Sequence, residues 1–225
     1  MPPQTTRTIA DALKAKGVSW AWYSGGWQAA LDDGRRPAQA KRNVIYNGGP
    51  TSPNFQPHHQ PFNYFAAFAP GTPERAQHIK DGDDLLTDAA AGRLPAVSFY
   101  KPPGRWTQHP SYTDVKSGDE HMASVLEALR RSPQWKDMLV VVTYDENGGY
   151  WDHVPPPRGD GWGDRFGPGT RVPALIIGPH VKRGHVDSTY YDTGSILKFI
   201  TERWGLEPLP GVRAKIGNLS AALQD

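Results

Sequence analysis

The sequence has 225 residues, of which 37% are hydrophobic, and this length suffices for one sizeable core in a single domain over residues 1–225. The 25 Lys and Arg residues nearly balance the 23 Asp and Glu residues, so the basic excess typical of nucleic-acid-binding proteins is missing. The sequence has no cysteine, which excludes disulfides and thiolate metal ligands, and no apolar run long enough for a transmembrane segment.

The first half of the chain alternates between helix and strand patterns. Residues 8–16 begin with Thr-Ile-Ala-Asp, which resembles a capping box and predicts a short helix. Residues 18–23 alternate in the manner of a strand. Residues 34–73 are rich in Pro, Gly and Asn and predict a long irregular insertion. Short helices are then expected to start at residues 72–74 and to cover residues 83–91.

The second half continues the alternation. Residues 95–100 predict a buried strand, and residues 117–131 place their apolar side chains on one helical stripe. Residues 138–143 form a continuous β-branched run, typical of a central strand covered on both faces, and residues 171–177 predict a similar strand. Residues 192–204 predict the last helix. This alternation indicates an α/β fold with helices around a mostly parallel sheet.

Two adjacent carboxylates, Asp145 and Glu146, follow the strand predicted at residues 138–143. The carboxyl end of a strand is where open α/β sheets bind their ligands. Because neighbouring carboxylates repel one another, a hard divalent cation would stabilise the pair. Two glycines then let the chain turn so that Asp152 and His153 return a carboxylate and an imidazole. The alternative is ordinary turn chemistry, because Asp, Asn and Gly commonly follow a strand.

Histidines add candidates to this site. His58 and His59 lie in a proline-pinned loop, and His109 follows the strand predicted at residues 95–100. Each of these histidines, taken alone, also fits a surface or packing position. Two other histidines are assigned to structural positions, His78 and His121.

The segment Thr143–Pro157, with the sequence TYDENGGYWDHVPPP, resembles the signature of a bacterial phosphoesterase family. This family includes phosphatidylcholine-hydrolysing phospholipases C and acid phosphatases, within the alkaline phosphatase superfamily. The resemblance covers nearly the whole chain, through residues 8–13, 17–23, 59–65, 104–117, 132–137 and 171–179. It implies an alkaline-phosphatase-like three-layer sandwich with a mostly parallel central sheet.

The resemblance also implies a function, which is metal-assisted hydrolysis of a phosphate monoester or diester through a phospho-enzyme, a phospholipid being one candidate substrate. Asp145 and Glu146 would bind a divalent ion of unspecified identity. His109, His58 and His59 would contact phosphoryl oxygens or protonate the leaving group. His153 is a secondary candidate for the metal site.

The sequence departs from the family pattern in one respect. Family members carry an N-terminal Glu-Asn metal motif and, further on, a nucleophilic Ser or Thr, and neither is found here. We therefore expect a C-terminal part of a longer enzyme, incomplete at its N-terminus and catalytically incomplete alone, whose nucleophile lies upstream. The missing N-terminal portion or a partner chain is the expected partner. Thr51 and Ser52 are not chosen as substitutes. The missing portion is expected to carry an export signal, which would make the enzyme periplasmic or secreted.

The sequence is also compatible with two other functions. One is a non-catalytic domain that binds a metal ion or phosphate. The other is an interaction domain whose aromatic loops bind lipid or protein and whose acidic cluster is structural.

Overall fold

The structure is a computed structural model that describes residues 2–158 and 167–224. These residues form two compact units. Unit 1 contains residues 2–6 and Ser19–Gln134, and unit 2 contains Arg7–Val18 and residues 135–224. A single domain over residues 1–225 therefore stays a prediction.

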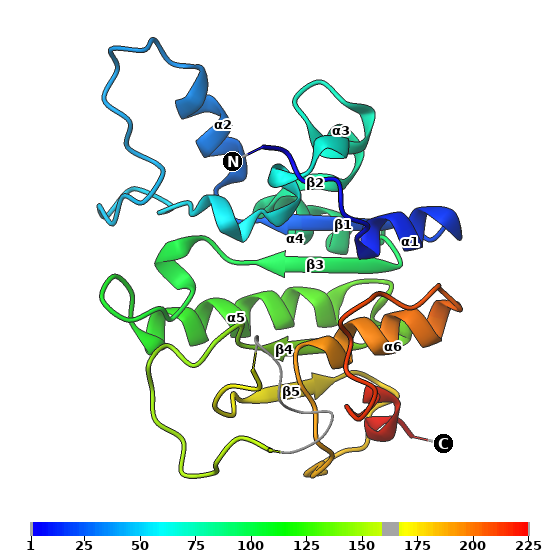
Figure 1. Ribbon diagram of the computed structural model, residues 1–225. Helices are drawn as coiled ribbons and strands as arrows, with labels where there is room; N and C mark the ends of the chain where they lie inside the picture. Colours follow the sequence, from blue (N-terminus) through cyan, green and yellow to red (C-terminus); the bar gives the residue numbers. More distant parts are fainter. Residues whose placement is uncertain (1, 159–166, 225) are drawn as a thin grey trace. The chain divides into compact units, whose positions relative to one another are not determined.

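Unit 1 is built on a three-stranded parallel sheet. Its strands are β1 (Trp20–Ser24), β2 (Ile79–Asp81) and β3 (Val97–Lys101). Strand β1 lies in the middle and pairs in parallel with both neighbours (Figure 1). Helices flank this sheet, so the predicted α/β class with parallel strands is confirmed.

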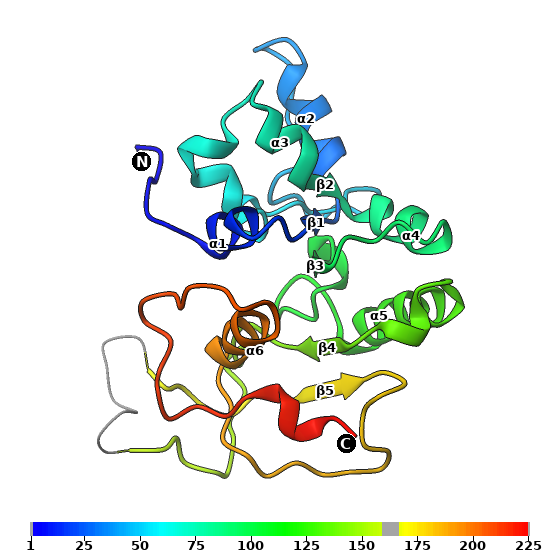
Figure 2. The ribbon, with the colours of Figure 1, turned by 90° about the vertical axis from the view of Figure 1, so that its right-hand side faces the viewer.

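Four α-helices belong to unit 1, namely α2 (Trp27–Arg35), α3 (Pro73–His78), α4 (Gly82–Ala90) and α5 (Val115–Arg131). Helix α4 lies on one face of the sheet, and a segment of short 3-10 helices lies on the other face (Figure 2). The 3-10 helices of unit 1 are Pro57–His59, Pro61–Tyr64, Ala66–Phe68 and Gly104–Trp106.

The side chains of β1 point alternately to the two faces of the sheet and so pack against different helices. Trp20 packs against Phe62 and Phe68 of the 3-10 segment, with ring centroids 4.8 and 5.8 Å away. On the opposite face, the Tyr23 hydroxyl donates a hydrogen bond of 2.9 Å to Asp88 of α4. Successive side chains of a strand point to opposite faces, which explains why both faces of β1 are covered.

The segment predicted to be irregular, residues 34–73, is irregular for most of its length, with three of the short 3-10 helices in its second half. Its first two residues close helix α2, which the sequence analysis did not anticipate. This helix buries Trp27, Ala30 and Asp33, one residue per turn. That spacing of three was the available signal for a helix.

Unit 2 contains helix α1 (Ile9–Ala15), strands β4 (Val140–Thr143) and β5 (Ala174–Ile177), and helix α6 (Gly194–Trp204). Its 3-10 helices are Trp135–Asp137 and Leu219–Ala222. The capping interaction predicted for α1 is present, because the Asp11 carboxylate accepts hydrogen bonds of 2.7 and 2.9 Å from the backbone and hydroxyl of Thr8.

Two expectations for the strands of unit 2 are wrong. Strand β4 is not covered on both faces, since Val140, Val141 and Val142 are half-buried and Thr143 is exposed. Strand β5 pairs with β4 in the antiparallel direction and leaves Leu175 56% exposed. Parallel pairing needs a crossover, usually a helix, and no helix occurs among the described residues that connect the two strands.

None of the described helices combines the length and the apolar character that crossing a membrane requires.

Candidate functional site

The carboxyl ends of the three parallel strands lie level with one another, because Ser24 of β1 is opposite Asp81 of β2 and Lys101 of β3. Glycine allows the loops that leave these ends to pack closely. A Cβ atom added at Gly25 would lie 2.2 Å from Cδ of Pro103, far inside van der Waals contact. The same edge is where α/β proteins bind their ligands.

Asp81 caps the two helices that begin at this edge, α2 and α4. Its carboxylate accepts hydrogen bonds from the backbone N–H of Gln28, at 2.7 Å, and of Asp83, at 3.1 Å. It therefore stabilises the first turns of both α2 and α4. The carboxylate of Asp81 is engaged in capping, which argues against a role as a ligand.

His59 is anchored to β1 through its backbone. Its carbonyl accepts hydrogen bonds of 2.9 Å from the Trp22 indole and from the Ser24 hydroxyl, and its side chain is buried. The neighbouring His58 is exposed, and the two imidazole rings lie 4.4 Å apart. The structure therefore brings these two predicted site residues together beside the carboxyl end of β1.

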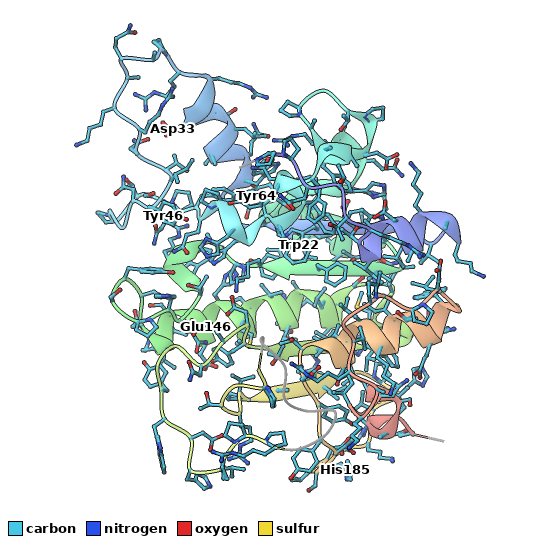
Figure 3. All side chains as sticks on the ribbon, in the orientation of Figure 1. Trp22, Asp33, Tyr46, Tyr64, Glu146 and His185 are labelled. Atoms are coloured by element: carbon cyan, nitrogen blue, oxygen red, sulfur yellow. The ribbon has the colours of Figure 1, made fainter. Side chains whose placement is uncertain are left out.

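Tyr46 orients the exposed imidazole of His58. Its hydroxyl lies 3.3 Å from Nδ1 of His58, and it sits in the irregular segment that follows α2 (Figure 3). Because this contact occupies Nδ1, Nε2 is the ring nitrogen that a ligand would meet. The sequence analysis missed Tyr46, since its contact with His58 spans 12 residues of irregular chain.

His109 is exposed on the loop that follows β3. Its Nδ1 lies 2.6 Å from the carbonyl oxygen of Pro110, and its ring stacks on Tyr112 with centroids 4.5 Å apart. A carbonyl can only accept, so Nδ1 carries the proton and Nε2 is left for proton exchange. The imidazole is thus held in one tautomer and one orientation.

Backbone strain concentrates around these histidines. In the described part of the chain, the non-glycine residues with φ between +49° and +79° are Tyr46, Asn54, Gln108 and Ser111. Two of them precede the His58-His59 pair, and the other two flank His109. Left-handed backbone costs about 1–2 kcal/mol at such residues and clusters at functional sites.

Unit 2 holds the predicted metal ligands. Asp145 and Glu146 follow β4, as expected, and Glu146 lies in the turn after that strand (Figure 3). Oε2 of Glu146 accepts a hydrogen bond of 2.6 Å from the backbone N–H of Gly148. The Glu146 carboxylate therefore stabilises its own turn, which is the structural role considered from the sequence.

Asp152 pairs with an arginine. Its carboxylate accepts hydrogen bonds from Arg171 at 2.9 and 3.2 Å and from the backbone N–H of Val154 at 3.1 Å. The bonds from Val154 and Arg171 hold the pKa of Asp152 below its usual value. His153 is 75% exposed, with Nδ1 3.6 Å from Asp152. The Asp152 carboxylate is thus occupied by Arg171 and Val154. A metal-ligand role for His153 stays a prediction.

The donors in the described structure suit a divalent ion in type but not in number. Among residues 2–158 and 167–224, no group of three or more His, Asp or Glu side chains is arranged to hold a metal ion. A structural or catalytic ion needs at least three or four protein donors or water. Asp145 and Glu146 can supply two oxygen ligands, so water or further donors would have to complete a metal centre there.

Two buried serine hydroxyls at these loops are engaged in hydrogen bonds. The Ser52 side chain is buried, lies 3.4 Å from the Val44 carbonyl, and accepts from the Asn54 N–H at 3.1 Å. Ser24 is fully buried and donates to His59. Both hydroxyls therefore hold the loops together.

The two histidines assigned to structural positions are packed inside unit 1. His78 is buried and stacks on Trp20, with centroids 4.3 Å apart. His121 stacks on Trp106 at 4.3 Å, and Nε2 lies 2.6 Å from the Tyr100 hydroxyl.

Comparison with known proteins is consistent with these features. A sequence model of the Phosphoesterase family matches residues 1–207. The non-hemolytic phospholipase C of Pseudomonas aeruginosa is 31% identical in a match covering 72% of this chain and 28% of that protein. The protein of the same name from Burkholderia pseudomallei is 30% identical, covering 96% of this chain and 35% of its own length.

A plant protein also matches. The non-specific phospholipase C6 of Arabidopsis thaliana is 35% identical over 53% of this chain and 28% of its own length. The chain thus spans about a third or less of the length of these three relatives. The family match, which covers far more than half of the residues, shows that this chain belongs to the phosphoesterase family.

Proposed function

We propose that this chain forms part of a phosphoester hydrolase of the phospholipase C type, in which His58, His59 and His109 form the phosphoryl site. The observation that carries the proposal is the family match over residues 1–207, together with relatives named phospholipase C. The geometry of unit 1 supports it, because exposed imidazoles on strained loops follow the ligand-binding edge of the sheet.

The proposed roles follow from the tautomers. With Nδ1–H of His109 bonded to the Pro110 carbonyl, Nε2 is the atom that takes up a second proton, and the imidazolium then donates this proton to a leaving-group oxygen. His58, whose Nδ1 faces the Tyr46 hydroxyl, presents Nε2 to a phosphoryl oxygen. His59 is buried and would contribute mainly by fixing the position of His58.

A divalent metal ion is part of the same proposal. Asp145 and Glu146 of unit 2 would supply two oxygen ligands to such an ion, whose chemistry is to stabilise negative charge on oxygen atoms. Isothermal titration calorimetry with Mn²⁺, Ca²⁺ and Zn²⁺ tests this role. We expect binding that Asp145→Asn weakens at least tenfold, with Asp137→Asn as the acidic control in unit 2. Equal affinity in wild type and Asp145→Asn would remove Asp145 from the metal site.

The substrate is proposed as a phosphate monoester or diester, with a phospholipid as the candidate that the names of the relatives suggest. Chromogenic phosphate and phosphorylcholine esters, assayed with each divalent ion, test the reaction. We assign no nucleophile and therefore expect little turnover from this chain alone. Turnover that survives both His109→Asn and Asp145→Asn would contradict the roles given to those residues.

Binding of inorganic phosphate tests the histidines without requiring turnover. We expect His109→Asn to weaken phosphate binding at least fivefold, because a charge-assisted hydrogen bond is lost. His185→Asn, which removes an exposed histidine of unit 2, is the matched control and should leave the affinity unchanged. Equal weakening by both variants would point to nonspecific attraction of the anion.

A further inference from the structure

The loop of residues 102–114, here called the His109 loop, joins β3 to α5 and carries the exposed His109. A residue of the preceding strand contacts a residue in the second turn of the following helix. The Tyr100 hydroxyl, on β3, lies 2.6 Å from Nε2 of His121, on α5. This contact closes the base of the loop across 21 residues of sequence.

The contact has a definite direction. Burial raises the pKa of Tyr100, and the nearby carboxylates of Asp83 and Asp81 raise it further, so the hydroxyl keeps its proton. Tyr100 therefore donates, and neutral His121 accepts at Nε2. The imidazole proton then resides on Nδ1.

Trp106 connects this contact to the loop itself. Its indole stacks on the His121 imidazole, with ring centroids 4.3 Å apart and planes 19° from parallel. The Arg105 guanidinium lies 4.2 Å from the centroid of the same indole, within the range of a cation–π interaction. Tyr100, Trp106 and His121 are together called the His121 clamp.

The middle of the loop is also pressed against α5. A Cβ atom added at Gly118, in the first turns of α5, would lie 2.3 Å from Cγ of Gln108 and 2.8 Å from the Trp106 carbonyl oxygen. Gln108 is the strained residue directly before His109, with φ of +62°. The packing of the helix against the loop therefore supports a backbone conformation that the loop would not favour alone.

We propose that His121 is a positioning residue: through Tyr100 and Trp106 it holds the His109 loop in the conformation that presents His109 to the phosphoryl group. The proposal rests on the proposed function for the role of His109. The geometry of the loop, however, can be measured without any ligand.

The clamp requires neutral His121. Burial lowers the pKa of His121, the Arg105 charge lowers it further, and Asp83 of α4 opposes both effects in part. A histidine whose folded pKa is depressed stabilises the fold above its unfolded pKa of about 6.5 and loses that contribution as the pH falls below it. The loop should therefore loosen as the pH falls below this unfolded pKa.

Native-state amide exchange, expressed as protection factors for residues 104–113 of the full chain, tests the proposal. Tyr100→Phe removes one hydroxyl and should lower protection of the loop about three- to tenfold, the range for one net hydrogen bond. His121→Gln keeps an acceptor for Tyr100 but cannot be protonated. In His121→Gln, the amide protection factors of the His109 loop should stay constant between pH 7.5 and 5.5, whereas those of the wild type should fall.

His78→Gln is the matched control, because His78 is another buried histidine stacked on a tryptophan, with Nδ1 2.8 Å from the Trp20 carbonyl. It should reduce the stability of unit 1 without a selective loss in the loop. The proposal is overturned if His78→Gln and Tyr100→Phe lower loop protection equally, or if wild-type protection is independent of pH.

A parallel measurement separates this proposal from the proposed function. Tyr100→Phe should weaken binding of inorganic phosphate by at least threefold. If the wild type binds no phosphate, the proposed role of His109 fails, while the exchange data still decide whether His121 positions the loop. If phosphate binds equally to wild type and Tyr100→Phe although the loop has loosened, positioning of His109 by the clamp is contradicted.

Discussion

The two segments that carry the predicted site residues are held in different ways. In unit 1, the loops with His58 and His109 are fixed by contacts distant in sequence, such as Ser24 with His59 and Tyr100 with His121. In unit 2, the side chains of Glu146, Asn147 and Asp152 accept hydrogen bonds from backbone N–H groups two residues further along the chain. The longer-range contacts of this segment include those of Asn147 and Asp152 with Thr170 and Arg171, and Trp151 is 83% exposed. The histidine loops therefore depend on the packing of unit 1 more than the carboxylate turn depends on unit 2.

Glycine substitutions in the two segments should show the largest difference in their effect on the free energy of unfolding. An alanine Cβ at Gly104 would lie 2.1 Å from the Asn54 carbonyl oxygen, whereas at Gly149 no atom lies within 4 Å and only φ, +78°, is unfavourable. Gly104→Ala should lower the free energy of unfolding by about 3 kcal/mol, and Gly149→Ala by about 1 kcal/mol. Urea denaturation measures both.

Gly34→Ala provides the control, because Gly34 lies in helix α2 with open space around it. It should leave stability unchanged or raise it by up to about 1 kcal/mol. Similar losses for Gly104→Ala and Gly149→Ala would show that the two segments are held equally well.

The next largest loss of stability is expected for a substitution at Asp88, which lies in helix α4 of unit 1. Asp88 accepts hydrogen bonds of 2.9 Å from Tyr23 and from Lys80, and Arg93 lies 3.4 Å away. Asp88→Asn should cost about 2 kcal/mol at pH 7, since hydrogen bonds to a charged group are weakened. Thermal unfolding followed by circular dichroism measures the loss.

The stability lost in Asp88→Asn should change with pH in one direction. Burial acts to raise the pKa of Asp88, but the bonds from Lys80 and Tyr23 outweigh it and the pKa is lowered. A lowered carboxyl pKa stabilises the fold above the unfolded value of about 3.9 and loses the contribution as pH falls through the folded value. The difference between wild type and Asp88→Asn should therefore shrink below about pH 4. A difference that grows in acid would exclude an ionised Asp88.

The smallest effect is expected for the ion pair of unit 2. Arg171 is 58% exposed where it meets Asp152, so water and salt screen the attraction. Arg171→Ala should shift the thermal midpoint by no more than about 2 °C. Differential scanning calorimetry in low and high salt measures it, and a large shift would mean that the segment is held as firmly as the loops of unit 1.

The parts of the fold that could be predicted were those with a local pattern. The helix at α5 followed from its apolar stripe, and the capping residues of α1 and α3 marked their starts. The direction of β5 could not be predicted, because an apolar run of four residues fits parallel and antiparallel pairing alike.

The same limit applies to the candidate site. The carboxylates after β4 are adjacent in sequence and were found directly, whereas Tyr46 and Ser24 meet the histidine segment only after folding. Ser24 is an ordinary polar residue at a strand end and Tyr46 an aromatic residue in irregular chain, and neither pattern is distinctive. The strained φ angles at Gln108 and Ser111 likewise have no signature in the residue types.

The most direct test follows the imidazole resonances of all eight histidines while inorganic phosphate is added to the chain. We predict that His58, His59 and His109 shift together with one affinity, while the packed His78 and His121 remain unchanged. Shifts confined to the histidines of unit 2, His153, His180 and His185, or no saturable shift at all, would contradict a phosphoryl-binding role for the histidine loops of unit 1.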